Sequence, residues 1–165
     1  MIAEVLNSYS LTLDYLQRLI HDVPDEALAS QANGVVNHPL WTIGHLVFAA
    51  QMIGQEIGAS AWLPDDWQEQ YGTGSLPVPE RSAYSTRDSL LSHLRDAQRR
   101  LAERLESIGD GAMHQPLPDK RYREMFPTIG HAVAHVLIAH TAAHVGQIIV
   151  WRKVNGIAPL AKVFD

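Results

Sequence analysis

Apolar residues recur every three or four positions over four stretches of the chain, a spacing that places side chains on one face of an α-helix. The first stretch covers residues 1 to about 22 and ends before Pro24. Its apolar stripe consists of Ile2, Val5, Leu6, Tyr9, Leu13, Leu16 and Ile20. No segment keeps the two-residue alternation of a β-strand over a useful length. The pattern therefore predicts an all-α fold.

The second helix is expected from residue 39 to about residue 58, and its start carries a clear signal. Asn37 or His38 can cap the first turn. Pro39 follows at the first helical position, where proline is tolerated because the N–H that it lacks has no partner inside the helix. The sequence thus predicts the start of this helix more closely than its end.

The third and fourth helices complete the pattern. Ser85 or Thr86 can cap the third, and we expect Gly109 to end it. Its apolar face consists of Leu90, Leu94, Ala97, Leu101, Leu105 and Ile108. The fourth is expected over residues 127–155. Four amphipathic helices in 165 residues predict a four-helix bundle that forms one domain, residues 1–165.

Two connections, residues 58–85 and 109–126, are longer than a bundle needs. Loops of this length in compact domains are either functional or disordered. The first contains four aromatic residues, Trp62, Trp67, Tyr71 and Tyr84. Such a segment is too aromatic for a disordered linker. We expect it to be ordered over one end of the bundle, with Trp62, Trp67 and Tyr71 as a candidate lid.

Composition narrows the class of protein. The chain is 46% hydrophobic and 19% charged, with a net charge of −5, which is typical of a soluble globular protein. Its basic residues are scattered, so no nucleic-acid partner is expected. No basic leader and no apolar run of membrane-span length is evident. With no cysteine, the chain suits a reducing cytoplasm, and we expect a cytoplasmic protein with no membrane partner.

The stretch HTAAHVGQIIVW places two histidines, His140 and His144, four positions apart on the fourth helix. At 100° per residue, several residues lie within about 80° of His140: Ile129, Val133, Val136, Leu137, His144, Gln147, Ile148 and Trp151. Both imidazoles therefore face the core. Two histidines at this spacing can chelate one cation. On the pair alone, core histidines bonded to carbonyl groups or water are the favoured interpretation.

A third histidine favours a metal site over separate core histidines. His45 shares a face of the second helix with Trp41, Ala49 and Met52. Packed helices lie about 8–10 Å apart, a gap that opposed imidazoles and one ion can fill. A single divalent ion explains all three histidines together. Its affinity should fall below about pH 6.5, because protonated imidazoles cannot bind a metal.

A second histidine pair, His131 and His135, lies about 140–180° from His140 on an ideal helix. We therefore expect this pair to be outside the metal site, in a contact between helices or subunits. Ile138, Ala142 and Ile149 share its face. A helix that is apolar on two opposite faces must be covered on both, which predicts a homodimer.

The combination of W-x-x-G-H-L with H-x-x-x-H-x-G-Q resembles the DinB/YfiT-like superfamily, over essentially the whole chain. The resemblance implies a four-helix bundle with one divalent metal, often nickel or zinc, held by three histidines. The matching residues here are His45, His140 and His144. Gln147 matches the family's glutamine, which implies either a structural role or a position next to the metal ligands. Some members are thiol-dependent transferases or isomerases, such as bacillithiol S-transferases and mycothiol-dependent maleylpyruvate isomerase.

The leading hypothesis is therefore a metal-dependent enzyme acting on a small molecule, as a thiol-dependent S-transferase or isomerase, or as a hydrolase. A low-molecular-weight thiol would be a second cofactor. Trp41 and Tyr9 are candidate pocket residues that exclude water. Glu56 lies about 16 Å along the helix from His45, too far for a base beside the metal, so no catalytic residue is assigned. The alternatives are a non-catalytic metal-binding module and a bundle without metal.

Overall fold

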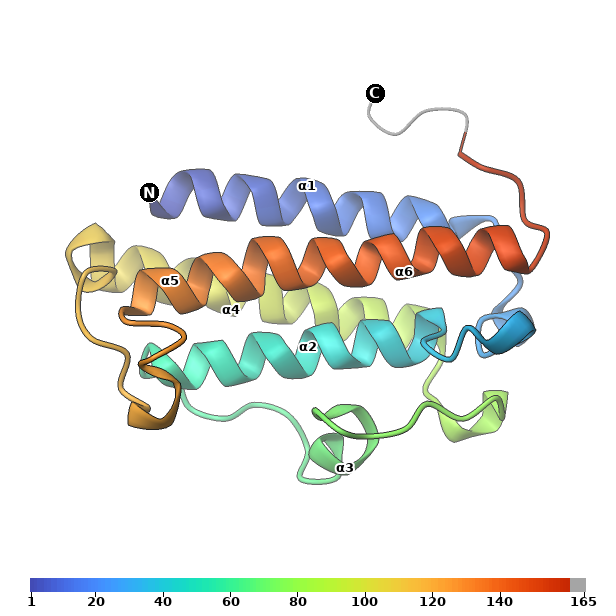
Figure 1. Cartoon of the computed structure of the whole chain (residues 1–165), viewed down its shortest axis with the longest axis horizontal. Coiled ribbons are helices and arrows are strands. Elements are labelled where there is room, and N and C mark those ends of the chain that lie inside the picture. Colours follow the sequence, from blue (N-terminus) through green and yellow to red (C-terminus); the bar gives the residue numbers. More distant parts are fainter. Residues whose placement is uncertain (161–165) are drawn as a thin grey trace.

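Long helices pack side by side into a bundle in the computed structural model, which describes residues 1–160 (Figure 1). They are α1 (Ile2–His21), α2 (Pro39–Glu56) and α4 (Arg87–Ala112). The last helical stretch is an uninterrupted series of α5 (Ile129–Ala134), a π-helical turn (His135–His140) and α6 (Thr141–Val154). We call this series the C-terminal rod. Residues 1–160 contain no β-strand, so the predicted all-α fold is confirmed.

The helix starts lie where the sequence predicts them. His38 caps α2, because its Nδ1 accepts the backbone N–H of Trp41 at 3.3 Å. Its Nε2 must then carry the ring proton, which it donates to the Val78 carbonyl at 3.0 Å. The hydroxyl of Thr86 caps α4, and that of Thr128 caps α5. Local hydrogen bonding thus fixes these boundaries.

Gly109 ends the regular part of α4. Its φ of 70° lies in the left-handed region, which glycine adopts without strain, and one further helical turn follows to Ala112. Asp110 in that turn accepts the backbone N–H of Ile2 at 2.9 Å. The expected stop of the regular helix at Gly109 is therefore confirmed, and a short turn in a new direction, in contact with the start of α1, follows it.

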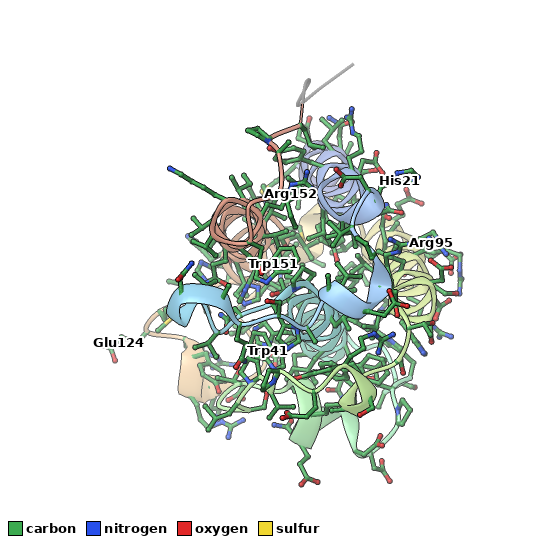
Figure 2. All side chains as sticks on the ribbon, turned by 90° about the vertical axis from the view of Figure 1, so that its right-hand side faces the viewer. His21, Trp41, Arg95, Glu124, Trp151 and Arg152 are labelled. Atoms are coloured by element: carbon green, nitrogen blue, oxygen red, sulfur yellow. The ribbon has the colours of Figure 1, made fainter. Side chains whose placement is uncertain are left out.

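One end of the bundle is tied together by two residues of α6. Figure 2 views the bundle end on, with Trp151 directed into its centre and Arg152 toward α1. Trp151 is fully buried and donates its Nε1–H to the Ser30 carbonyl at 2.7 Å. Arg152 is also buried and pairs with Asp22 at 2.6 Å. These bonds fix the C-terminal rod against α1.

The connections contain only short helical elements. These are 3₁₀ turns Asp25–Ala27 and Ala32–Gly34 between α1 and α2, helix α3 (Trp67–Tyr71) and turn Arg81–Ala83 before α4, and turn Lys120–Tyr122 before α5. Helix α3 packs on the outer side of α2, away from α1 (Figure 1). Trp67 and Tyr71 are buried there. The aromatic connection is therefore ordered, as predicted, but it lies along the outer side of α2 and not over one end of the bundle.

The C-terminal rod, Ile129–Val154, is long and apolar enough to cross a membrane by length and composition alone, and no other helix within residues 1–160 is. The sequence pattern had not predicted a segment of membrane-span length. In the structure the rod packs against α1 and α2 as part of the bundle. A core helix of a bundle passes the same test of length and composition.

Candidate metal centre

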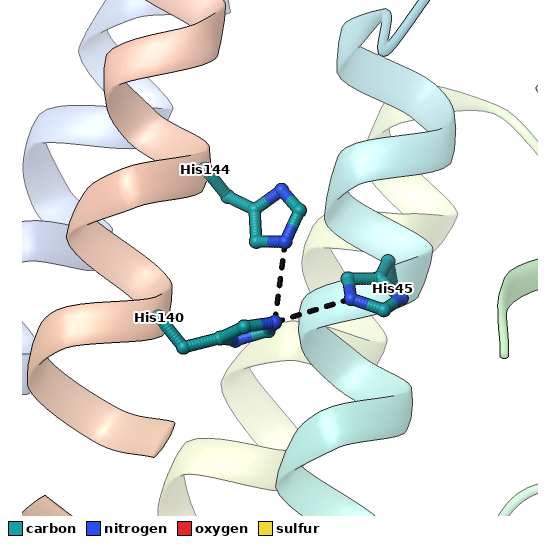
Figure 3. Close-up of side chains that lie close together, drawn as sticks. All are labelled: His45, His140 and His144. Carbon is teal, nitrogen blue, oxygen red and sulfur yellow. Dashed lines mark hydrogen bonds between the residues drawn. The ribbon is translucent and has the colours of Figure 1, made fainter. Parts of the chain in front are cut away.

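Three histidines converge between α2 and the C-terminal rod (Figure 3). His45 comes from α2, while His140 ends the π-helical turn and His144 lies one turn later in α6. Nε2 of His140 lies 3.2 Å from Nε2 of His45 and 3.2 Å from Nε2 of His144. The structure thus brings together the three residues that the helical faces selected.

The outer nitrogen of two of these rings is fixed by a hydrogen bond. His45 Nδ1 lies 2.8 Å from the Tyr71 carbonyl oxygen, which can only accept. His144 Nδ1 lies 2.9 Å from Gln147 Oε1, which also accepts from Asn37 Nδ2 at 3.0 Å. Both Nδ1 atoms therefore carry the ring proton. Both Nε2 lone pairs are left free to face His140.

The spacing of these nitrogens matches that of metal ligands. Two ligands of a tetrahedral zinc ion with Zn–N bonds of about 2.0 Å lie about 3.3 Å apart, close to the 3.2 Å observed. Without a cation, the single proton of His140 could satisfy only one of the two facing lone pairs. His140 Nδ1 is moreover buried without a hydrogen-bond partner in the described chain. Three neutral imidazoles can hold a metal ion here and suit zinc, nickel, copper or iron.

Burial keeps the three rings neutral. It lowers the pKa of both His140 and His144 to about 4, with the neighbouring histidines adding to the shift. Burial also lowers the pKa of His45, and the bond to the Tyr71 carbonyl partly opposes the shift. A metal ligand must be the neutral imidazole. At neutral pH the cluster is therefore ready to bind a cation without first losing protons.

Trp41 and Tyr71 hold His45 in place. The Trp41 indole stacks on the His45 ring with centroids 4.7 Å apart and planes 9° from parallel, and its Nε1–H donates to Ser75 Oγ at 2.9 Å. The Tyr71 ring lies directly over Gly44, where a Cβ would be only 2.1 Å from it. The absence of a side chain at Gly44 thus lets Tyr71 approach His45.

A cavity of about 730 Å³ extends from the histidines toward the chain between α4 and α5. His45 and His140 line its inner end. Apolar side chains line much of it: Phe48, Ala49, Met52, Ile53, Leu117, Met125, Phe126, Ala132 and Val136. The remaining lining residues are polar: Glu56, Gln68, Thr73, Asp119, Arg121, Tyr122 and His135. Its volume is that of a typical small-molecule site.

The π-helical turn changes which histidines share a face. In an α-helix, His135 and His140 would be about 140° apart, and the sequence therefore placed His135 outside the site. π-Helical hydrogen bonds join residues five apart, so the turn from His135 to His140 directs both toward the same cavity. His135 thus lines the cavity, and it stays outside the cluster of His45, His140 and His144, as predicted. His131 is exposed and does not line the cavity.

The aromatic residues predicted as a lid lie elsewhere. Trp67 and Tyr71 are buried in the core, and Trp62 is partly buried beside Gly54 of α2. None of them lines the cavity, although Gln68 and Thr73 of the same connection do. Tyr9 is buried in α1 and is also not a lining residue.

Residues 117–126 provide the outer wall of the cavity, which the sequence pattern does not predict. Met125 is 70% exposed and Tyr122 50% exposed. The length of this connection and its mixture of aromatic and charged residues were the available signals. No feature of the local sequence indicates that residues 117–126 fold back over α2.

Comparison with known protein families supports the same assignment. A family model described as the DinB superfamily matches residues 8–148, a range that includes His45, His140 and His144. Comparisons with curated proteins and with solved structures give no significant match. The match covers most of the chain and agrees with its helical architecture. The chain therefore belongs to the DinB superfamily.

Proposed function

We propose that this protein is a metal-dependent enzyme that activates a small molecule at His45, His140 and His144, as an S-transferase or isomerase that uses a low-molecular-weight thiol. The observation that carries the proposal is the cavity of about 730 Å³ that reaches two of the three histidines. A purely structural metal site is closed by four protein ligands. Three histidines beside a cavity leave room for an exogenous ligand.

The chain's own residues have defined parts in such a reaction. The neutral imidazoles hold the ion, which we propose to be zinc or nickel, and Tyr71 and Gln147 orient two of them. When bound, such an ion lowers the pKa of a coordinated thiol or water. The apolar wall excludes water from the reacting thiol. Because the chain has no cysteine, the thiol must be a small molecule.

The test is a coupled search for metal and turnover. Protein purified without chelator or polyhistidine tag is analysed for metals and then assayed with chlorobimane and a panel of thiols. The panel includes bacillithiol, mycothiol, glutathione, coenzyme A and mercaptoethanol. We expect thiol conjugation that the His144→Ala variant loses. Turnover that persists unchanged in this variant would remove the metal from the reaction.

Hydrolysis and a non-catalytic module are the alternatives. No carboxylate is hydrogen-bonded to the three histidines in residues 1–160, so a base for activating water is less evident than a site for a thiol. Hydrolysis of a generic ester with no thiol dependence would favour the hydrolase. Metal binding without any turnover would favour the module.

Gln147 should support metal binding without contacting the ion. Replacing Gln147 with alanine removes the acceptor that orients His144, and the loss of such a partner typically weakens metal affinity about 10–100-fold. Gln147→Glu keeps an acceptor for both His144 and Asn37 and should retain most of the affinity. Competition titration against a chromogenic chelator measures both variants. Equal affinity of Gln147→Ala and the unchanged protein would contradict this role.

Metal affinity should change little between pH 7.5 and pH 6.0, in contrast to the fall below about pH 6.5 that ordinary imidazoles would give. Three exposed imidazoles with a pKa near 6.5 would lose about fiftyfold in affinity over this range by proton competition. Burial lowers the pKa of His140 and His144 to about 4, so protons compete only at lower pH. We expect a change of less than about threefold. A fiftyfold loss at pH 6.0 would show that the rings are solvated.

The same shift links folding to pH. The folded pKa values of His140 and His144, about 4, lie below the unfolded value of about 6.5. The unfolded chain therefore binds more protons between these values. In the metal-free protein, the two neutral histidines contribute fully to the free energy of unfolding above about pH 6.5, and this contribution is lost as the pH falls toward 4.

We also propose a homodimer formed through the outer face of α6. Ile149 and Val150 are 43% and 51% exposed, and Ala142 is exposed beside them. A groove of about 500 Å³ borders this face, between residues 34–37 and α6. Ile149→Glu should convert a dimer to a monomer in light scattering at micromolar concentration. A monomeric unchanged protein would refute the proposal. Location in the cytoplasm and the absence of nucleic-acid and membrane partners stay predictions.

A further inference from the structure

We propose that the cavity takes an elongated ligand with a metal-binding head, an apolar body and a neutral or cationic tail, and that it discriminates against carboxylate tails. This inference rests on the proposed function, because the head is placed at the three histidines. The cavity supplies the rest of the description, through the order of residues along its floor and the charge at its far end.

The floor of the cavity is one face of α2. His45, Phe48, Ala49, Met52, Ile53 and Glu56 follow one another at helical spacing, and all of them line the cavity. The eleven-residue interval from His45 to Glu56 corresponds to about 16 Å of helix. A metal-binding group at one end and a carboxylate at the other are therefore separated by a long apolar surface.

The opposite walls are apolar along the same length. Val136 and Ala132 line the cavity from the C-terminal rod, while Leu117 and Phe126 line it from the connection between α4 and α5. These apolar side chains offer a ligand no hydrogen-bonding group, and the polar lining residues outside the histidine cluster and the charged end are Gln68, Thr73, Tyr122 and His135. Desolvating a polar ligand body here would cost free energy without a compensating hydrogen bond. The body of the ligand should thus be apolar.

The charged residues that line the far end of the cavity carry more negative than positive charge. Arg121 donates to both carboxylate oxygens of Asp119, so these two charges offset each other. Glu56 accepts the Asp119 backbone N–H at 3.0 Å, but it has no ion-pair partner among residues 1–160. Among the charged residues that line this end, two carboxylates and one guanidinium therefore leave one net negative charge beside the ligand tail.

This charge distinguishes between tails. An ammonium group near Glu56 is attracted, and a carboxylate is repelled. Because the end is partly exposed, each effect is modest, and together they should separate the two tails by about tenfold in affinity. Thiols that carry several carboxylates or phosphates, such as glutathione and coenzyme A, should consequently be poor ligands of this cavity.

The test uses protein loaded with Co²⁺ and three thiols that share one eleven-carbon chain: aminoundecanethiol, mercaptoundecanol and mercaptoundecanoic acid. Thiolate coordination to cobalt gives a charge-transfer band, so each titration reports binding without turnover. We expect the amine to bind about tenfold more tightly than the acid, with the alcohol between them. Mercaptoethanol, which cannot reach the far end, should bind more weakly than all three.

Variants at the far end make the test specific. Glu56→Gln should abolish the preference for the amine, while Glu124→Gln, on the same outer loop but directed away from the molecule (Figure 2), should leave it unchanged. Arg121→Gln should enlarge the preference, and it provides a second readout if Glu56→Gln fails to fold. Cobalt content and the melting temperature of each variant show whether the site and the fold are intact.

The outcomes separate the two proposals. Equal affinity for the three tails, or a preference that survives in Glu56→Gln, would overturn the assignment of the substrate class. In that case a band with mercaptoethanol would leave the proposed metal-dependent activity intact. Failure to bind cobalt at all, or binding of cobalt without a band from any thiol, would overturn the proposed thiol chemistry and the inference built on it.

Discussion

Replacement of His140 with alanine is expected to lower the affinity for a divalent metal by more than about 100-fold. Loss of a group that only orients a metal ligand already lowers the metal affinity about 10–100-fold. His140 is expected to be a ligand itself, so its loss should have a larger effect. Its Nε2 lies 3.2 Å from both other Nε2 atoms, so its removal leaves the other two without their common neighbour. Metal content and competition titrations measure the effect.

His131→Ala is the matched control for this experiment. His131 lies on the same rod but is exposed and outside the cavity, so its loss should leave metal content unchanged. Both variants remove one imidazole, so non-specific binding to surface histidines affects them equally. Equal metal content in His140→Ala and the unchanged protein would refute the three-histidine site.

Gly44→Ala is expected to destabilise the protein by about 1–3 kcal/mol and to weaken metal binding at the same time. A Cβ at position 44 would lie 2.1 Å from Cδ1 and 2.2 Å from Cε1 of Tyr71, a separation that buried atoms cannot keep. The Tyr71 ring would have to move. Its carbonyl, which accepts from His45 Nδ1, would be displaced with it, and the orientation of His45 would be lost.

Gly111→Ala serves as the control, because a Cβ there meets no atom within 4 Å. Chemical denaturation of both variants, together with a metal titration of each, separates a local clash from a general effect of replacing glycine. Gly111→Ala should leave both quantities nearly unchanged. If Gly44→Ala were as stable as the unchanged protein and bound metal equally well, the close approach of Tyr71 would not support the site.

The helices and their starts follow from local sequence. His38, Thr86 and Thr128 cap helices that the apolar spacing predicts, because a cap is a hydrogen bond between residues two or three positions apart. The same periodicity selected His45, His140 and His144, since a residue's face on a regular helix depends only on its position. The resemblance to the DinB superfamily selected the same three histidines.

Other features depend on contacts between distant residues. The π-helical turn moves His135 into the cavity, and no rule of regular helical spacing reveals where a helix departs from regularity. The Tyr71 carbonyl that orients His45 comes from the aromatic connection, which the sequence suggested as a lid. Its buried rings show instead that it completes the core and supports His45 of the three-histidine cluster.

The sequence by itself determined the all-α class, the helix starts and the helix faces on which the three imidazoles lie, because these depend on short-range hydrogen bonding and on the fixed period of the α-helix. Only the tertiary structure decided the shape and charge of the cavity. Residues 117–126 form its wall only after they fold back over α2, and Glu56 becomes its charged end only when Asp119 and Arg121 pair beside it. The free energy of such contacts belongs to the packed arrangement of several segments, and no single segment encodes it.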